Sequence, residues 1–363
     1  MRIGLVYDLR EEYRAMGYSD EETAEFDSVE TIEAIEAALM RLGHEVVRVG
    51  HGRELARRLV AGERFDLVFS IAEGLNGRSR EAQVPALCEL FDQPYVFSDP
   101  LTMAVTLDKA MAKRIVRDAG IPTAPFLVYE RAGQDLAGWT HYPAFVKPLA
   151  EGTGKGCEKA SMVGDAEALR LAAESTLTRY RQPALIESYL PGREFTVGIL
   201  GTGEAARVVG VMEIVLRTHA GADKGVYSYL NKEECERLVD YRKADDSEAM
   251  HAAGHALAAH KALGCRDGAR HDLRSNAQGE PVFLEVNPIA GLHPSHSDLP
   301  ILAGLNGMSY DTLIGEIVAA ACARYGLTPA QSSKIAQRNK APALHTKSGA
   351  KTRPKAKSKS ASL

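Results

Sequence analysis

The sequence predicts an α/β protein with an N-terminal parallel α/β domain, a central domain, and a C-terminal α+β domain built on an antiparallel sheet. Strand-like runs alternate with helical segments through the first hundred residues, a second strand and helix pattern follows, and closely spaced strands come last. Alternating strands and helices favour a parallel sheet, whereas strands joined by tight turns favour an antiparallel one. We therefore expect domains at residues 1–100, 101–185 and 186–326, followed by a basic disordered tail at 327–363.

Length and composition are those of a soluble globular protein. The 363 residues are 45% hydrophobic and 25% charged, and no uncharged apolar run approaches the roughly 20 residues of a membrane helix. We therefore expect a cytoplasmic protein with no membrane partner. The five cysteines are far apart and form no C-x-x-C pair, which argues against a disulfide framework or a structural zinc site.

The N-terminal domain is expected to contain four strands and two helices. β-Branched and apolar runs predict the strands at residues 2–8, 45–49, 66–71 and 94–97. Helices are expected at residues 28–42 and 53–62, the first beginning after a side-chain acceptor and ending at Gly43.

The rest of the chain continues this pattern up to about Tyr325. Helices are predicted at residues 108–119 and 246–263, and strands at 144–148, 184–187, 195–200 and 208–212. Beyond Tyr325 the sequence consists of Ser, Lys, Ala and Pro without an apolar period, which is typical of disorder.

Two short strands, at residues 270–274 and 282–287, flank a turn-rich segment and predict a β-hairpin. Because side chains alternate between the faces of a strand, Arg270 and Asp272 share one face, as do Glu285 and Asn287. A register that places Asp272 opposite Glu285 puts the turn at residues 278–279.

This hairpin is a candidate magnesium site. Two carboxylates and an amide oxygen are ligands suited to Mg²⁺, and an adjacent arginine can neutralise a phosphate or an oxyanion. An exposed hairpin face with ordinary surface charges is the alternative, and the spacing alone does not decide between them.

A glycine-rich loop at residues 152–156 follows Lys147 at the end of a predicted strand. Glycines let backbone N–H groups approach an anion, so a phosphate contact is plausible. The loop is not a Walker A motif, because Gly156 stands where Ser or Thr should follow the lysine. A plain mobile loop has a similar composition.

Several segments occur in the order found in ATP-grasp enzymes. They are Asp108-Lys109, residues 145–148, the glycine loop, residues 185–190 and 193–197, the hairpin, and residues 285–291. The set most resembles the D-alanine–D-alanine ligase family, over nearly the whole chain up to about residue 325. The resemblance implies an ATP-grasp fold and an ATP-dependent ligase that forms an amide bond through an acyl phosphate. It also implies small amino-acid or peptide substrates and a homodimer.

The resemblance further implies a role for individual residues. Lys109 and Lys147 would bind ATP phosphates, Gly152, Thr153 and Gly154 would cover them, Glu187, Ser188, Tyr189 and Leu190 would form the adenine hinge, and Glu194 would hold the ribose. Asp272, Glu285 and Asn287 would hold two Mg²⁺ ions, for which Mn²⁺ could substitute. Arg270 and the backbone N–H of Gly291 would stabilise the oxyanion.

Departures from the family pattern fall where the substrates should bind. Thr153 stands where the family usually has Ser, and Asn76 lies near the position of a His that helps to hold the first D-alanine. The N-terminal segment is longer than the usual loop, and within it Glu25 is the candidate for the family's substrate glutamate.

The region of the second substrate is also changed. Lys232 matches a family lysine near the second carboxylate, but Glu233 replaces the Tyr that usually follows it. After Ser297, Asp298 replaces a Leu. A carboxylate here would disfavour the carboxylate of D-alanine by like-charge repulsion, unless it faces solvent or a cation.

The sequence leaves other functions open. A related ligase could join other amino acids or a peptide. A non-catalytic protein could bind nucleotides, or bind nucleic acid through the tail, because residues 330–363 contain nine Lys or Arg and no acid. The remaining residues carry 35 cationic against 48 anionic side chains, a net charge of −13 that repels a polyanion, so we expect no nucleic-acid partner. His251 and His255 lack the intervening Glu of a zinc protease, and we expect no metal at these histidines or at His260.

Overall fold

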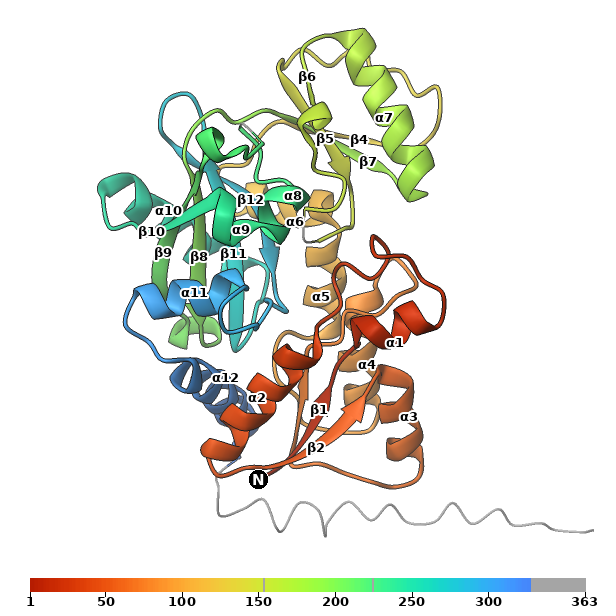
Figure 1. Cartoon of the computed structure of the whole chain (residues 1–363), viewed down its shortest axis with the longest axis vertical. Helices are drawn as coiled ribbons and strands as arrows, with labels where there is room; N and C mark the ends of the chain where they lie inside the picture. Colours follow the sequence, from red (N-terminus) through yellow and green to blue (C-terminus); the bar gives the residue numbers. More distant parts are fainter. Residues whose placement is uncertain (153, 224, 328–363) are drawn as a thin grey trace, which may run out of the picture.

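The computed structural model describes residues 1–152, 154–223 and 225–327, which form three sheets with helices around them (Figure 1). The predicted disordered tail therefore lies outside the described residues, apart from Leu327. Within those three ranges no helix has both the length and the apolarity to cross a membrane.

The N-terminal sheet is parallel, with the strand order β2-β1-β3. It consists of β1 (Arg2–Val6), β2 (Glu45–Gly50) and β3 (Leu67–Ser70), and the intervening helices are α2 (Val29–Arg41) and α3 (Gly52–Val60). These elements confirm the predicted alternation. A further helix, α1 (Arg10–Ala15), lies in the long segment after β1.

The predicted fourth strand at residues 94–97 is wrong. Tyr95 forms only an isolated parallel bridge with Val68. Two residues later Phe97 adopts a left-handed conformation (φ 71°), and its N–H donates to Asp267. Because a left-handed residue breaks the extended backbone, pairing with β3 stops after one bridge.

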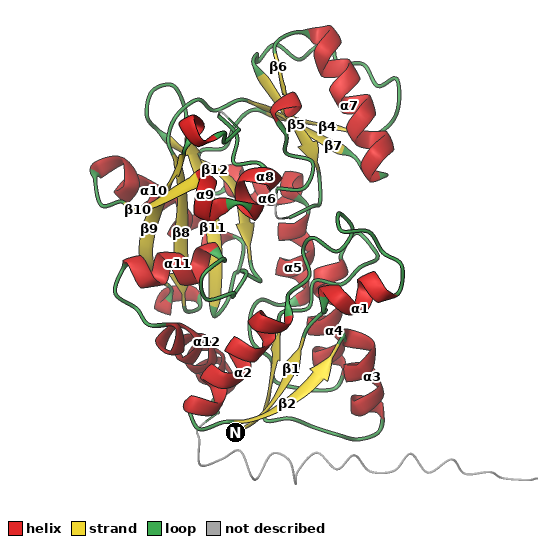
Figure 2. Cartoon of the chain, viewed as in Figure 1, coloured by secondary structure: helices red, strands yellow, loops and turns green. Residues whose placement is uncertain are grey.

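The central sheet has the order β4-β7-β5-β6 and is antiparallel throughout. Its strands are β4 (Phe126–Tyr129), β5 (Ala144–Pro148), β6 (Met162–Val163) and β7 (Ala184–Ser188). Helix α7 (Ala166–Tyr180) covers one face (Figure 2) and buries Leu169 and Ala173 against Val146 and Ile186. Helix α6 (Lys109–Asp118) leads into this sheet, with Asp108 as its N-cap.

The C-terminal sheet has the order β10-β9-β8-β11-β12. Its strands are β8 (Glu194–Leu200), β9 (Arg207–Leu216), β10 (Val239–Lys243), β11 (Gly268–Ser275) and β12 (Pro281–Asn287). Helix α10 (Ser247–Ala262) packs its alanines against Val197 on one face. Helix α11 (Asp298–Leu305) covers the other, where a Cβ on Gly198 would lie 2.9 Å from Leu299.

The hairpin β11–β12 has the predicted register at the residues of interest, with Arg270 opposite Asn287 and Asp272 opposite Glu285. A bulge then shifts the register, so that Leu273 pairs with Phe283. Phe283 would otherwise share the face of Glu285, but the extra residue turns it into the core, where it is fully buried.

The last helix, α12 (Tyr310–Tyr325), returns to the N-terminal domain. Leu313, Ile314 and Ile317 are buried in the same cluster as Ile35 of α2. Arg41 of α2 forms an ion pair with Asp311 at 2.6 Å. The two ends of the described chain are therefore packed together.

Candidate active site

Two adjoining cavities are lined by segments that lie far apart in the sequence. The larger, about 390 Å³, is lined by residues 24–28 and other N-terminal segments on one side and by residues 285–298 on the other. The smaller, about 110 Å³, lies between the central sheet and the hairpin. Lys109, Glu285 and Lys232 are among the residues that line both, so the cavities meet at these side chains.

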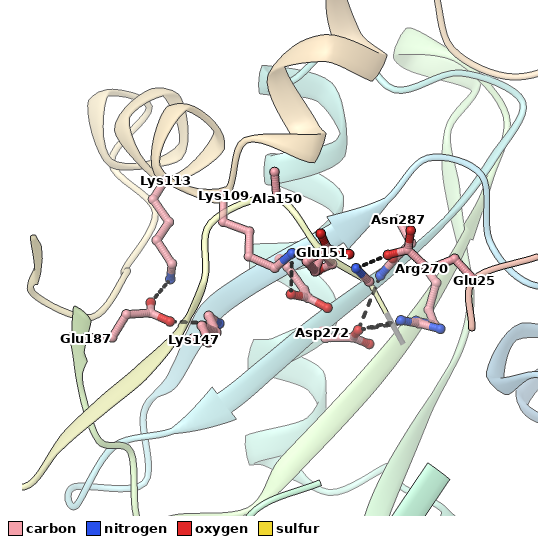
Figure 3. Close-up of polar contacts among 12 residues, drawn as sticks. Glu25, Lys109, Lys113, Lys147, Ala150, Glu151, Glu187, Arg270, Asp272 and Asn287 are labelled. Carbon is pink, nitrogen blue, oxygen red and sulfur yellow. Dashed lines mark hydrogen bonds and ion pairs between the residues drawn. The ribbon is translucent and has the colours of Figure 1, made fainter. Parts of the chain in front are cut away.

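A buried chain of charges, Lys113–Glu187–Lys147, connects α6 to the central sheet beside the smaller cavity (Figure 3). The Glu187 carboxylate lies 2.6 Å from Lys113 Nζ and 2.7 Å from Lys147 Nζ. Burial alone would raise the pKa of Glu187, but the two ammonium groups outweigh it and lower that pKa. Lys113 also donates to the Phe283 carbonyl, which ties α6 to the hairpin.

Lys109, the first residue of α6, joins the glycine loop to the hairpin. Its ammonium group donates to the Glu151 carbonyl and lies 3.5 Å from the Glu285 carboxylate. Burial would raise the pKa of Glu285, but nearby cations, Lys109 and Lys147 foremost, hold it well below its usual range. Glu285 is therefore a buried anion that is balanced by lysines.

The same face of the hairpin holds Arg270 between two carboxylates. Its guanidinium lies 2.9 Å from Asp272 and 3.3 Å from Asp298. Burial would lower the pKa of Arg270, but these carboxylates raise it. The Asn287 amide donates to Asp272 at 3.4 Å, so Arg270, Asp272 and Asn287 form one group, as Figure 3 shows.

Asp298 is the first residue of α11 and is only 6% exposed. Besides its ion pair with Arg270, it accepts a hydrogen bond from the Tyr227 hydroxyl at 3.3 Å. It lines the larger cavity, as do Lys232 and Ser297. Asp298 thus faces a cation and the cavity rather than solvent.

At the far end of the smaller cavity, Arg274 links Tyr189 and Glu194. Its guanidinium lies 3.3 Å from the Glu194 carboxylate and donates to the Tyr189 hydroxyl at 3.1 Å. Burial raises the pKa of Glu194 despite the opposing effect of Arg274. The arginine therefore holds both side chains at the wall of the cavity.

The N-terminal end of the larger cavity is lined by acids. Glu25 forms an ion pair with Arg80 at 2.6 Å and accepts a hydrogen bond from the Gly152 N–H. Asp27, Glu73 and Glu81 line the same end. Burial raises the pKa of Asp27 to about 7 and that of Glu81 to about 7, and burial together with neighbouring carboxylates raises that of Glu73.

Nearly all of the predicted site residues line one of the two cavities, although their roles stay predictions. The smaller is lined by Lys109, Lys147, Gly154, Glu187, Ser188, Tyr189, Leu190, Glu194, Lys232, Asp272 and Glu285. The larger is lined by Glu25, Gly152, Arg270, Asn287, Gly291, Ser297 and Asp298. Thr153 and the side chain of Glu233 lie outside the described residues.

Asn76, which lies near the position of a family histidine, lines a third cavity with Tyr13 and Gln83, whereas Glu73 lines the larger cavity. Sequence reasoning also missed Lys113, Arg274 and Glu81. The spacing of Lys113, four residues after Lys109 on the same helix, is the one signal that could have indicated it.

A buried histidine pair lies away from both cavities. Within the described chain, His260, Cys265 and His271 are close enough to hold a metal. However, His260 already contacts His271 at 3.2 Å and the Gly201 carbonyl at 3.2 Å. Burial lowers the pKa of His260 to about 4, so the pair is neutral and hydrogen-bonded within the core.

Comparison with known proteins gives consistent results. A family model described as D-ala D-ala ligase C-terminus matches residues 115–319. A curated D-alanine–D-alanine ligase from Aquifex aeolicus is 35% identical over 296 residues, covering 80% of this chain and 94% of that protein. One from Bordetella petrii is 33% identical over 77% of this chain and 82% of the relative.

Solved structures show the same fold. The D-alanine–D-alanine ligase from Bacillus anthracis complexed with ATP superimposes with a TM-score of 0.69 at 23% identity, covering 90% of this chain and 99% of that one. The VanG D-Ala:D-Ser ligase from Enterococcus faecalis gives a TM-score of 0.66 at 21% identity, covering 88% and 99%. With a family model over more than half its length, the chain belongs to the D-alanine–D-alanine ligase family of ATP-grasp enzymes.

Proposed function

We propose that the protein uses ATP to join the carboxylate of one amino acid to the amine of another, as a D-alanine–D-alanine ligase does. One observation carries this proposal. The lysine-lined smaller cavity and the acid-lined hairpin meet at Lys109 and Glu285, at the mouth of a cavity large enough for small amino acids. A relative that joins other amino acids or a peptide would use the same machinery.

ATP is assigned to the smaller cavity. Lys109 and Lys147 would bind its phosphates, and the loop of Gly152, Thr153 and Gly154 would cover them. Because the Glu187 carboxylate is occupied by two lysines, the adenine contacts would come from the backbone and from Ser188, Tyr189 and Leu190. Glu194, held by Arg274, would accept hydrogen bonds from the ribose.

The donors of the hairpin fit Mg²⁺. Asp272, Glu285 and Asn287 offer oxygen ligands from two paired strands, and both carboxylates are largely buried. Burial and the charge of Glu285 raise the pKa of Asp272 against the effect of Arg270, so an added cation would stabilise this pair. Bound here as two ions, Mg²⁺, or Mn²⁺ in its place, would neutralise charge on the β- and γ-phosphates.

The chemistry then requires positioning and charge stabilisation rather than a covalent enzyme intermediate. A substrate carboxylate oxygen attacks the γ-phosphorus, and the bond to ADP breaks. The second amino acid's amine attacks the acyl carbon, loses a proton, and phosphate leaves. Arg270 and the Gly291 N–H would oppose the negative charge on the tetrahedral oxygen. A Cβ on Gly291 would lie 2.8 Å from Ser297 Oγ, so glycine keeps this backbone accessible.

The test is ADP release by the full chain with ATP, Mg²⁺ and single or paired D- and L-amino acids. We expect release that requires both Mg²⁺ and an amino acid, with stoichiometric formation of a dipeptide by mass spectrometry. ATP binding without turnover under every pairing would contradict the proposal. Sedimentation velocity of the same preparation tests the homodimer that we propose from the family resemblance.

A further inference from the structure

At the N-terminal end of the larger cavity, acidic side chains outnumber the basic side chains that could pair with them. Asp27 precedes α2, Glu73 follows β3, and Glu81 lies in a short 3₁₀ helix (Arg80–Ala82), so three separate segments bring them to one wall. Glu81 is only 9% exposed. Across residues 1–152, 154–223 and 225–327, none of the three forms an ion pair within 4 Å.

The nearest arginines are already engaged. Arg80 pairs with Glu25 at 2.6 Å and donates to the Ala150 carbonyl at 3.0 Å. Arg10 donates to the carbonyls of Ala24 at 2.6 Å and Phe26 at 3.2 Å. These contacts hold the surrounding loops in position and leave Glu73 and Glu81 without a direct cationic partner.

Buried carboxylates without a cation carry a large desolvation cost when ionised. They therefore either take up protons, as their raised pKa values indicate, or bind a cation that enters the cavity. A substrate α-ammonium group has one positive charge. In the described chain Asp27, Glu73 and Glu81 form no ion pair, and even with the hydrogen bond between Glu73 and Glu81 these three groups, beyond the neutralised Glu25, exceed what that single charge requires.

Building on the ligase activity proposed above, we propose that Asp27, Glu73 and Glu81 bind a side-chain ammonium group, so that the preferred substrate at this end of the cavity is a diamino acid. A side chain of one to four methylenes that ends in an amine can form an ion pair with these buried carboxylates. A neutral side chain would leave the carboxylates without a cationic partner.

The test compares substrates that differ only in the presence of the terminal amine. ADP release by the full chain is measured with ornithine and with norvaline, which lacks the terminal amine, and with 2,3-diaminopropionate and alanine, in both configurations. We expect a kcat/KM at least tenfold higher for one diamino acid than for its neutral counterpart. Equal or better use of alanine and norvaline would overturn the inference while leaving the ligase function intact. Absence of turnover with every amino acid would instead contradict the proposed function on which the inference rests.

Two variants locate the effect. Glu81→Gln and, separately, Glu73→Gln should lower the diamino-to-neutral ratio at least fivefold and leave the KM for ATP unchanged. Glu204→Gln removes the same charge from an exposed surface position and should leave the ratio unchanged. Because glutamine is nearly isosteric with glutamate, we expect folded variants. An unchanged ratio in both folded cavity variants would overturn the assignment to these carboxylates.

Discussion

The two cavities of this protein treat charge in opposite ways. Beside the smaller one, Lys113 and Lys147 contact Glu187, and Lys109 contacts Glu285, at distances of 2.6 to 3.5 Å. At the N-terminal end of the larger one, Asp27, Glu73 and Glu81 lie close enough to repel one another, and Glu25 pairs with Arg80. In the function proposed above, the first arrangement binds the phosphates of ATP and the second contacts the amino acid.

The largest effect is expected where the cavities meet. Glu285→Gln and Asp272→Asn should each reduce kcat for ADP release at least a thousandfold, because a lost ligand leaves phosphate charge without neutralisation. The secondary structure should be unchanged by circular dichroism. Glu280→Gln, an exposed acid beside the turn of the same hairpin, is the control and should keep full activity. Near-normal turnover in the two hairpin variants would mean that the metal assignment is wrong.

A second variant tests whether the buried charges beside the smaller cavity stabilise the fold. Glu187→Gln removes the anion between two buried ammonium groups and should lower the free energy of unfolding by about 3–5 kcal/mol, as is typical when one partner of a buried pair is removed. The KM for ATP should rise as Lys147 loses its orientation. Urea denaturation measures the first effect and ADP release the second.

The control for this prediction is Glu167→Gln, whose exposed ion pair with Arg170 on α7 is expected to contribute nothing measurable. Equal stability of the Glu187 and Glu167 variants would show that the buried charges do not stabilise the fold.

The hairpin could be predicted from sequence because strand geometry fixes its faces. Once β11 and β12 are recognised, Asp272 and Glu285 must share a face, and the observed pairing agrees. The bulge after Asp272 could not be predicted, because it depends on how Phe283 packs under α6 and α10. The Lys113–Glu187 pair joins residues 74 positions apart, and no local pattern reports such a contact.

The substrate end was harder to predict because its residues lie in loops. Loops have no side-chain period, so the sequence did not indicate Glu73, which lines the larger cavity three positions before Asn76. Glu25 was found only through the family resemblance. Glu81 belongs to no motif. Its significance appears only once its burial and its lack of an ion pair in the described chain are known.

The third prediction uses pH to separate the two cavities. Asp27 and Glu81, each with a pKa of about 7, lose their protons as the pH rises from 6 to 8, and an ammonium group binds the ionised form. The KM for the amino acid should therefore fall about tenfold over this range, whereas the KM for ATP should change little. The charged groups that act on these two acids include Asp8, Arg10, Glu25, Glu73, Arg80 and Lys109.

Glu81→Gln supplies the internal control, because it should reduce the pH dependence of the KM for the amino acid. If the KM for the amino acid of the unsubstituted protein did not change between pH 6 and 8, these carboxylates would not contact the substrate.

The smallest effect is expected at the other end of the larger cavity, where Asp298 competes for Arg270. Because its carboxylate lies 3.3 Å from Arg270, it occupies part of the charge that a substrate carboxylate would otherwise use. Asp298→Leu should therefore lower the KM for the second D-alanine severalfold. Because Asp298 is buried and paired with Arg270, its loss should also lower the free energy of unfolding, although Asp272 still balances Arg270. Asp298→Asn keeps the size and removes the charge, so the same direction in both variants would identify charge as the cause. A low parent KM that neither substitution changes would mean that Asp298 orients Arg270 and Tyr227 without selecting the substrate.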